Sequence, residues 1–169
     1  MKTYFAGGCF WCMEKPYHLI EGVISATSGY CGGTEVNPAY ADVKAQKTQH
    51  RETVCVEFDE SKVSFAELLE VFLNSIDPFD AGGQFIDRGR SYTCAVYYTD
   101  AEQKSVTERR LAEVERTFGQ KVAVAVEPYL RFWPAEDYHQ DYARRNPEAY
   151  QKELEQSGRR AFSGGLKSE

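Results

Sequence analysis

The pattern of apolar and polar residues divides the chain into alternating strand-like and helix-like segments. Short apolar or β-branched runs predict strands at residues 3–6, 22–28, 52–58, 92–98 and 122–126. Apolar residues at helical spacing predict helices over residues 64–76 and 100–118. The first of these begins with Ser64 and Glu67, which have the form of a capping box. A further helix is expected from Cys9 to Lys15, where Pro16 interrupts or kinks it.

The order of these elements predicts the fold class. Two β-α-β units with mostly antiparallel pairing are typical of a ferredoxin-like α+β sandwich. Residues 29–50 and 77–91 are predicted to be long loops, and loops of this length usually carry function. A chain of 169 residues suits one domain with its own core. We therefore expect a single domain over residues 1–169, ordered to about residue 155, with a poorly ordered tail over 156–169.

Composition and charge exclude several classes of partner. The net charge is −6 and no basic stripe is present, which argues against binding to nucleic acid. No apolar run approaches the ~20 residues that cross a bilayer, so a membrane protein is not expected. The first strand follows Met1 directly and leaves no room for a signal peptide, which predicts a cytoplasmic protein.

The strongest chemical signal is the stretch from Gly7 to Cys12, which lies between a predicted strand and a predicted helix. A cysteine at a helix N-terminus feels the positive end of the helix dipole, which stabilises the nucleophilic thiolate. Two glycines before it permit a tight turn and close approach by another molecule. Phe10 and Trp11, exposed at the helix start, are placed to wall an apolar pocket. We therefore predict a reactive thiolate at Cys9.

Other interpretations of these cysteines stay open. A lone cysteine is usually a small buried hydrophobic residue. Cys9-x-x-Cys12 also fits a dithiol redox pair or half of a metal site. Zinc normally needs four ligands, and the chain offers no second such pair and only three histidines. We therefore expect neither a metal nor a cofactor.

Several motifs occur together in one order along the chain. They are GGCFWC at residues 7–12, GYCGG at 29–33, NPAYADV at 37–43, HRE at 50–52, DRG at 87–89 followed by Tyr92, and FWPAEDYHQ at 132–140. Over roughly residues 3–150 the chain resembles the A-type peptide methionine-S-sulfoxide reductase family. The resemblance implies an α+β fold with a ferredoxin-like core, in agreement with the order of predicted elements.

The resemblance also implies a reaction and its residues. The family reduces the S epimer of methionine sulfoxide, free or in proteins. Cys9 would attack the sulfoxide sulfur and become a sulfenic acid, while Glu52 protonates the oxygen as a general acid. A carboxyl group can do so near neutral pH only if burial raises its pKa. The remaining implied roles are binding of the oxygen by Tyr40 and Tyr92, ordering of water and polar groups by Asp87, and binding of the methyl group by Phe10 and Trp11.

The chain departs from the family where a recycling cysteine would be expected. Many members carry that cysteine after an Asn-Pro segment near the C-terminus, and Gln151 stands there in this chain. Cys12, three residues after Cys9 on the first helical turn, is the predicted resolving cysteine. Cys31, in the predicted glycine-rich loop, is the runner-up. Thioredoxin is the reductant that the resemblance implies.

Two functions of other classes stay possible on the sequence. One is a general dithiol-disulfide oxidoreductase that uses Cys9 and Cys12 and needs no acid at Glu52. The other is a non-catalytic metal-binding module. A glutamate on an alternating strand is by itself usually a solvent-facing residue, and Cys55 and Cys94, on predicted strands, fit core packing.

Overall fold

The computed structural model describes residues 1–159. Its helices are α1 (Phe10–His18), α2 (Tyr40–Lys44), α3 (Phe65–Ser75), α4 (Ala101–Phe118), α5 (Tyr142–Arg145) and α6 (Pro147–Gln156), with 3-10 turns at Arg90–Tyr92 and Asp137–His139. Its strands are β1 (Lys2–Gly7), β2 (Val23–Cys31), β3 (Arg51–Phe58), β4 (Gly83–Gln84), β5 (Asp87–Arg88), β6 (Cys94–Tyr98), β7 (Val124–Pro128) and β8 (Phe132–Pro134).

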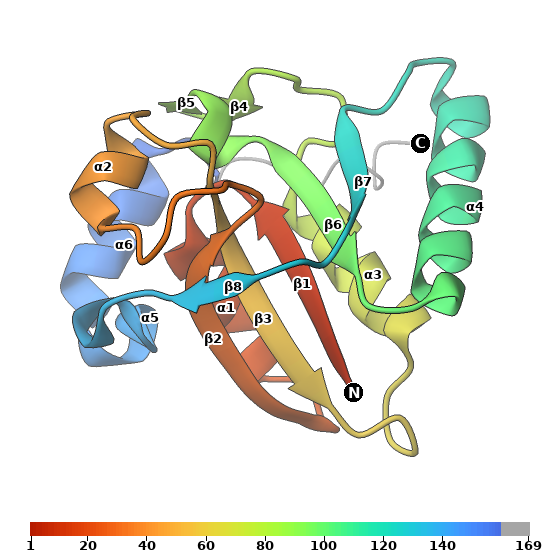
Figure 1. Ribbon diagram of the computed structural model, residues 1–169, viewed down its shortest axis with the longest axis horizontal. Coiled ribbons are helices and arrows are strands. Elements are labelled where there is room, and N and C mark those ends of the chain that lie inside the picture. Colours follow the sequence, from red (N-terminus) through yellow and green to blue (C-terminus); the bar gives the residue numbers. More distant parts are fainter. Residues whose placement is uncertain (160–169) are drawn as a thin grey trace.

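Six of the strands form one sheet in the order β7-β6-β1-β3-β2-β8 (Figure 1). The central four, β6-β1-β3-β2, pair antiparallel. Helix α1 connects β1 to β2, and α3 lies in the connection from β3 to β6, so each connection passes over one intervening strand. This is the predicted ferredoxin-like arrangement, which is therefore confirmed. At one edge β7 adds parallel to β6, and at the other β8 adds antiparallel to β2. The short β4 and β5 pair separately as a small hairpin.

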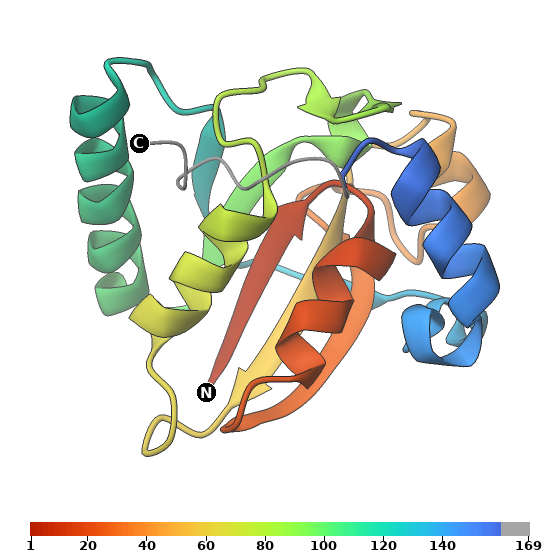
Figure 2. The same cartoon turned by 180° about the vertical axis from the view of Figure 1, so that it is seen from behind.

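Helices α1 and α3 lie against one face of the sheet, where the main core forms (Figure 2). Phe5 of β1 is fully buried there, and its ring stacks on Phe72 of α3 at 5.0 Å and on Tyr17 of α1 at 5.6 Å. The chain between β7 and β8 crosses the opposite face, where Tyr129 stacks on Tyr4 at 4.3 Å. Apolar and aromatic surface is therefore buried on both faces of the sheet, against helices α1 and α3 on one side and the β7–β8 connection on the other, and this burial stabilises the fold.

The ends of the predicted helices follow their capping residues. The Ser64 hydroxyl accepts from the Glu67 backbone N–H at 3.1 Å, and the Glu67 carboxylate accepts from the Ser64 N–H at 2.9 Å. This confirms the capping box. Helix α4 begins after Asp100, whose carboxylate accepts from the Gln103 N–H, and ends at Gly119 in the left-handed conformation.

Three boundaries differ from the prediction. Helix α1 continues through Pro16 to His18, because a proline in the last turn removes only one intrahelical hydrogen bond. The predicted loop 29–50 contains the end of β2 and the short helix α2. Tyr92 belongs to a 3-10 turn, and the strand after it begins at Cys94.

Past Tyr98 three further differences appear. The last predicted strand is displaced to Val124–Pro128, and β8 was not predicted, because three residues are too few to show a period. The start of the predicted tail is packed: α6 runs to Gln156, and Ser157 is buried, with its carbonyl accepting from the Ile86 N–H at 3.2 Å. The rest of that tail, residues 160–169, lies outside the described residues. Within residues 1–159 no helix has the length and apolar character needed to cross a membrane.

Candidate active site

The turn between β1 and α1 places Cys9 at the N-cap of the helix. Its carbonyl accepts from the N–H groups of Cys12 and Met13, both at 3.2 Å, which starts the first helical turn. Gly8 has φ +86°, a conformation that a residue with a side chain rarely adopts. At Gly7 a Cβ atom would lie 2.8 Å from Ile76 and Met13. The two glycines are therefore required for the turn to pack directly on α1 and on the end of α3.

A small cavity of about 130 Å³ opens beside Cys9. The residues that line it come from α1, α2, β3, β5, α6 and the 3-10 turn after β5, and they are Cys9, Trp11, Tyr40, Lys44, Glu52, Asp87, Tyr92 and Glu153. Six elements, several of them far apart in the sequence, thus bring most of the predicted site residues together. A larger hollow of about 340 Å³ lies on the other side of Trp11, between α1 and α5, and contains no thiol.

Glu52 of β3 is buried, which differs from the solvent-facing position that an alternating strand usually gives a glutamate. Its Oε1 accepts from the Phe10 backbone N–H at 3.1 Å. Its Oε2 is buried and has no hydrogen-bond partner among the described residues. Burial, which opposes the charged form more strongly than the Phe10 N–H favours it, raises the pKa of Glu52 to about 8. At neutral pH this carboxyl group therefore carries a proton.

Tyr40, Tyr92 and Asp87 surround the same cavity. Burial raises the pKa of both tyrosines, and the nearby Glu52 raises it further, so their hydroxyls stay protonated as hydrogen-bond donors. Burial, followed by the charge of Glu153, raises the pKa of Asp87. The cavity thus contains two hydroxyl donors and a carboxylic acid beside one thiol.

Phe10 and Trp11 differ in position. The sequence predicted both to be exposed, but Phe10 is 1% exposed and packs in the core with its ring 6.0 Å from Tyr40. Trp11 lies at the cavity, and its indole N–H donates to His139 Nδ1 at 3.1 Å. Its ring also stacks on Tyr142 at 4.0 Å. Trp11 is therefore held in one orientation. Phe10 instead packs behind Tyr40, because an aromatic side chain buries more apolar surface in the core than at an exposed helix start.

Cys9 and Cys12 pack in one small cluster at the start of α1. Interaction with the Cys12 thiol, followed by burial, raises the pKa of Cys9, and interaction with the Cys9 thiol lowers the pKa of Cys12. The sequence predicted a thiolate at Cys9 from the helix N-terminus alone. The neighbouring thiol and burial oppose the effect of the helix dipole at Cys9.

Comparison with known proteins gives the same result as the motifs. Residues 1–167 match the family described as peptide methionine sulfoxide reductase. The chain belongs to this family. Peptide methionine sulfoxide reductase MsrA 2 of Staphylococcus aureus (strain Mu50) is 43% identical over 159 residues, covering 93% of this chain and 90% of the relative. MsrA 2 of Rhizobium meliloti (strain 1021) is 44% identical, covering 86% and 73%. The protein is thus a methionine sulfoxide reductase.

Solved structures of the family share the fold. Mxr1 of Saccharomyces cerevisiae in its reduced form has a TM-score of 0.82 and 26% identity, covering 88% of this chain and 86% of Mxr1. Methionine sulfoxide reductase A of Corynebacterium diphtheriae has a TM-score of 0.79 and 27% identity, covering 86% and 74%. Mxr1 is also known in complex with Trx2, a structure with a TM-score of 0.58 and 21% identity.

In this reductase the other cysteines lie apart from the Cys9–Cys12 pair. Cys31 ends β2 rather than lying in a loop, and its Sγ donates to the Arg131 carbonyl at 3.2 Å. Tyr30, the preceding residue, packs with the core under the helices, so Cys31 points to the opposite face of the sheet. Cys55 packs in the same cluster as Cys31, and Cys94 packs in the main core.

Several residues of the reductase site were not predicted. Lys44 and Glu153 line the cavity, and Tyr150 of α6 packs directly against Cys9 and Cys12. The sequence around Lys44 and around Glu153 does not distinguish these residues from other charged surface residues. Only the folded chain shows that they lie at the cavity. Gln151, where a recycling cysteine was expected, is exposed on α6 and donates to Glu155 at 3.0 Å.

Two of the histidines, His139 and His50, make polar contacts that hold parts of the fold together. His139 is fully buried, accepts from the Trp11 indole through Nδ1 and has no partner at Nε2 among the described residues. His50 accepts from the Gly33 N–H at 3.2 Å and contacts the Glu35 carbonyl at 2.8 Å, which holds the loop after β2. Within residues 1–159 no three histidine, cysteine, aspartate or glutamate side chains are grouped as metal ligands.

Proposed function

We propose that the reductase acts on the S epimer of methionine sulfoxide through a sulfenic acid on Cys9. The observation that carries this proposal is the buried, protonated Glu52, which lines the cavity beside the thiol and whose Oε2 has no partner among the described residues. A dithiol-disulfide exchange needs no such acid, since its leaving group is a thiolate. Breaking a sulfur–oxygen bond does need one, because the oxygen must be protonated to leave sulfur.

The first step follows from the protonation of these groups. One proton leaves the Cys9–Cys12 pair, the Cys9 sulfur attacks the sulfoxide sulfur as a thiolate, and Glu52 gives its proton to the oxygen. The hydroxyl group then transfers to Cys9, which leaves methionine, a Cys9 sulfenic acid, a Cys12 thiol and a Glu52 carboxylate. The hydroxyls of Tyr40 and Tyr92 hold the oxygen as negative charge develops on it. Trp11, backed by Phe10, receives the methyl group, and Asp87 orders the polar groups at the rim.

The second step regenerates the thiols. The Cys12 thiol attacks the Cys9 sulfur, water leaves, and a Cys9–Cys12 disulfide forms. A disulfide needs Cα atoms roughly 4.4–6.8 Å apart, and residues three apart on a helix lie close to this range. The dithiol of thioredoxin then reduces this bond. Support for this partner comes from the yeast relative Mxr1, which was solved in complex with the thioredoxin Trx2.

Mass spectrometry after one turnover tests the proposal. The reduced protein is mixed with one equivalent of methionine-S-sulfoxide, quenched with an alkylating reagent and digested. We expect one methionine per chain and a Cys9–Cys12 disulfide, with Cys31, Cys55 and Cys94 alkylated as thiols. Reaction with protein disulfides but not with the sulfoxide would instead support the dithiol-disulfide oxidoreductase.

A further inference from the structure

Residues 157–159, which follow α6, return to the turn that carries the thiols (Figure 2). Ser157 holds this segment in place: its carbonyl accepts from the Ile86 N–H between β4 and β5, and its hydroxyl accepts from the Arg159 N–H at 3.2 Å. Arg159 is therefore linked to the β4–β5 hairpin through Ser157, and its side chain reaches the end of β1 and Met13 of α1.

The Arg159 guanidinium is held by three separate segments. Nη1 donates to the Ser75 carbonyl at the end of α3, at 2.7 Å. Nη2 donates to the Gly7 carbonyl, two residues before Cys9, at 2.8 Å. The plane of the group lies over the Phe85 ring, with 4.7 Å between Cζ and the ring centroid. Two backbone carbonyls and an aromatic face thus fix the position of a permanent positive charge.

The adjacent glycine makes room for this charge. A Cβ atom at Gly8 would lie 2.9 Å from Arg159 Nη2, closer than side chains tolerate. Gly8 therefore serves two purposes: it adopts the positive φ of the turn, and it lets the guanidinium approach the turn that ends at Cys9.

The surroundings of the two thiols are otherwise acidic. The titratable or charged groups that face them are Glu52 of β3, Asp87 of β5, Tyr40 and Lys44 of α2, Tyr92 of the 3-10 turn, and Tyr150 and Glu153 of α6. Glu52 raises the pKa of Cys9, and Glu153 and Asp87 raise that of Cys12. Arg159 lowers the pKa of both thiols, which opposes these carboxyl groups.

We propose that Arg159 is a positioning residue of the active site, whose guanidinium, held beneath the Gly7–Gly8 turn, favours the loss of one proton from the Cys9–Cys12 pair. The proton leaves to solvent, and the negative charge on the pair is balanced by the arginine. This rests on the proposed function in so far as Cys9 and Cys12 are the reactive pair. The C-terminal segment thus supplies a charge to the reaction although it carries no cysteine.

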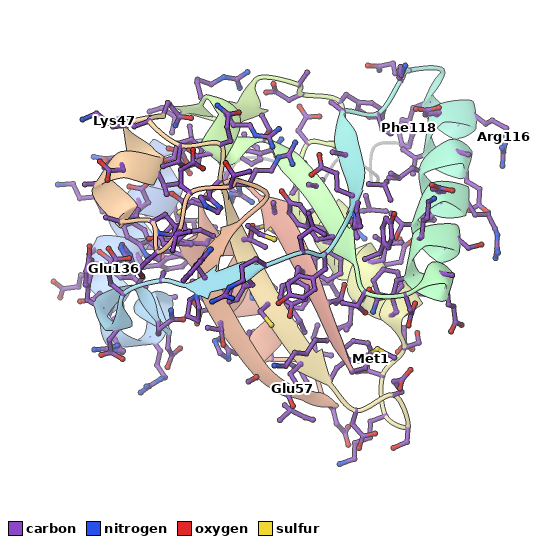
Figure 3. All side chains as sticks on the ribbon, viewed as in Figure 1. Met1, Lys47, Glu57, Arg116, Phe118 and Glu136 are labelled. Carbon is purple, nitrogen blue, oxygen red and sulfur yellow. The ribbon has the colours of Figure 1, made fainter. Side chains whose placement is uncertain are left out.

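The test measures the thiols without any sulfoxide. Fully reduced protein is alkylated with iodoacetamide between pH 5 and 10, and tandem mass spectrometry follows the rates at Cys9 and Cys12. The variants are Arg159→Gln, which keeps hydrogen-bond donors but loses the charge, and Arg159→Lys, which keeps the charge. Arg116→Gln is the matched control, because Arg116 lies on α4 at the far side of the molecule (Figure 3). Thermal melting is recorded for each.

In Arg159→Gln we expect the midpoint of alkylation to rise by about one pH unit, with about tenfold slower alkylation at pH 7, because an opposite charge is lost. Arg159→Lys should restore at least half of this shift, and Arg116→Gln should match the wild type. An unchanged midpoint in Arg159→Gln overturns the proposal, and so does an equal shift in both Arg159 variants, which would show a purely structural role. If the disulfide of the proposed function does not form but the midpoint shifts, the reaction scheme fails and the electrostatic role of Arg159 stands.

Discussion

Phe10 and Glu52 are joined by a hydrogen bond that spans 42 positions of sequence, from the Phe10 backbone N–H to Glu52 Oε1. Phe10 is the first residue of α1 and Glu52 lies on β3, so this contact joins the helix N-terminus to the central sheet. Since Phe10 directly follows Cys9, the same contact places the acid beside the thiol. The other oxygen of Glu52 has no hydrogen-bond partner among the described residues, and under the proposed function it gives its proton to the substrate.

Replacing the acid should slow the chemical step. Glu52→Gln keeps the size of the side chain and an acceptor for the Phe10 N–H but cannot give a proton. We expect the single-turnover rate of sulfoxide reduction to fall about 10²–10⁴-fold, with an unchanged circular dichroism spectrum. The matched control is Glu57→Gln on the same strand, at the opposite end of the sheet from α2 (Figure 3). Wild-type kinetics in Glu52→Gln would remove this residue from the mechanism.

The raised pKa of Glu52 should also affect stability. The folded protein retains the Glu52 proton up to a pH of about 8, whereas the unfolded chain loses it near 4.5. Between these values the free energy of unfolding should fall as pH rises, by up to about 1.4 kcal/mol for each pH unit. The Glu52→Gln variant does not undergo this fall in the free energy of unfolding. The melting temperature of the variant minus that of the wild type should therefore increase from pH 4.5 to 8 and then stay constant. A constant difference across this range would show an ordinary pKa at Glu52.

The choice of resolving cysteine can be tested directly. Cys12→Ser should complete one turnover and then stop as a Cys9 sulfenic acid, with thioredoxin-coupled activity largely lost. Cys31→Ser should cycle like the wild type, because the Cys31 thiol lies on the other face of the sheet and a serine can still donate to the Arg131 carbonyl. A dimedone adduct at Cys9 after one equivalent of substrate detects the sulfenic acid. The opposite result, with Cys31→Ser inactive in recycling, would assign the role to Cys31.

The cavity should distinguish the two epimers of the substrate. Trp11 forms an apolar wall, while Glu52, Tyr40 and Tyr92 present protonated oxygens at the same cavity. A sulfur that carries a methyl group and an oxygen can satisfy both sides at once in only one configuration. We expect turnover of the purified S epimer and at least 100-fold slower turnover of the R epimer, as roughly 3 kcal/mol of lost polar contacts would produce. Similar rates on both epimers would contradict this assignment of the cavity walls.

The local pattern of the sequence was sufficient for much of the fold. The capping box at Ser64, the apolar period of α3 and the Asp100 cap of α4 act within one or two helical turns, so they can be predicted without knowledge of the rest of the chain. The two glycines before Cys9 likewise predicted a tight strand-to-helix turn. The predicted end of the first helix at Lys15 was too early, because the effect of Pro16 on a helix depends on how many turns follow it.

The sequence by itself determined the alternating elements, the ferredoxin-like order and the cysteine at a helix start, because each depends on neighbours along the chain. Only the tertiary structure decided the protonation of the site. The pKa of Glu52 rises because the sheet and α1 bury it, and the pKa of Cys9 rises because of the neighbouring Cys12 thiol, followed by burial. The position of Arg159 under the Gly7–Gly8 turn also depends on contacts across the whole chain. Burial and electrostatic interactions are sums over everything nearby in space, which no local pattern of residues contains.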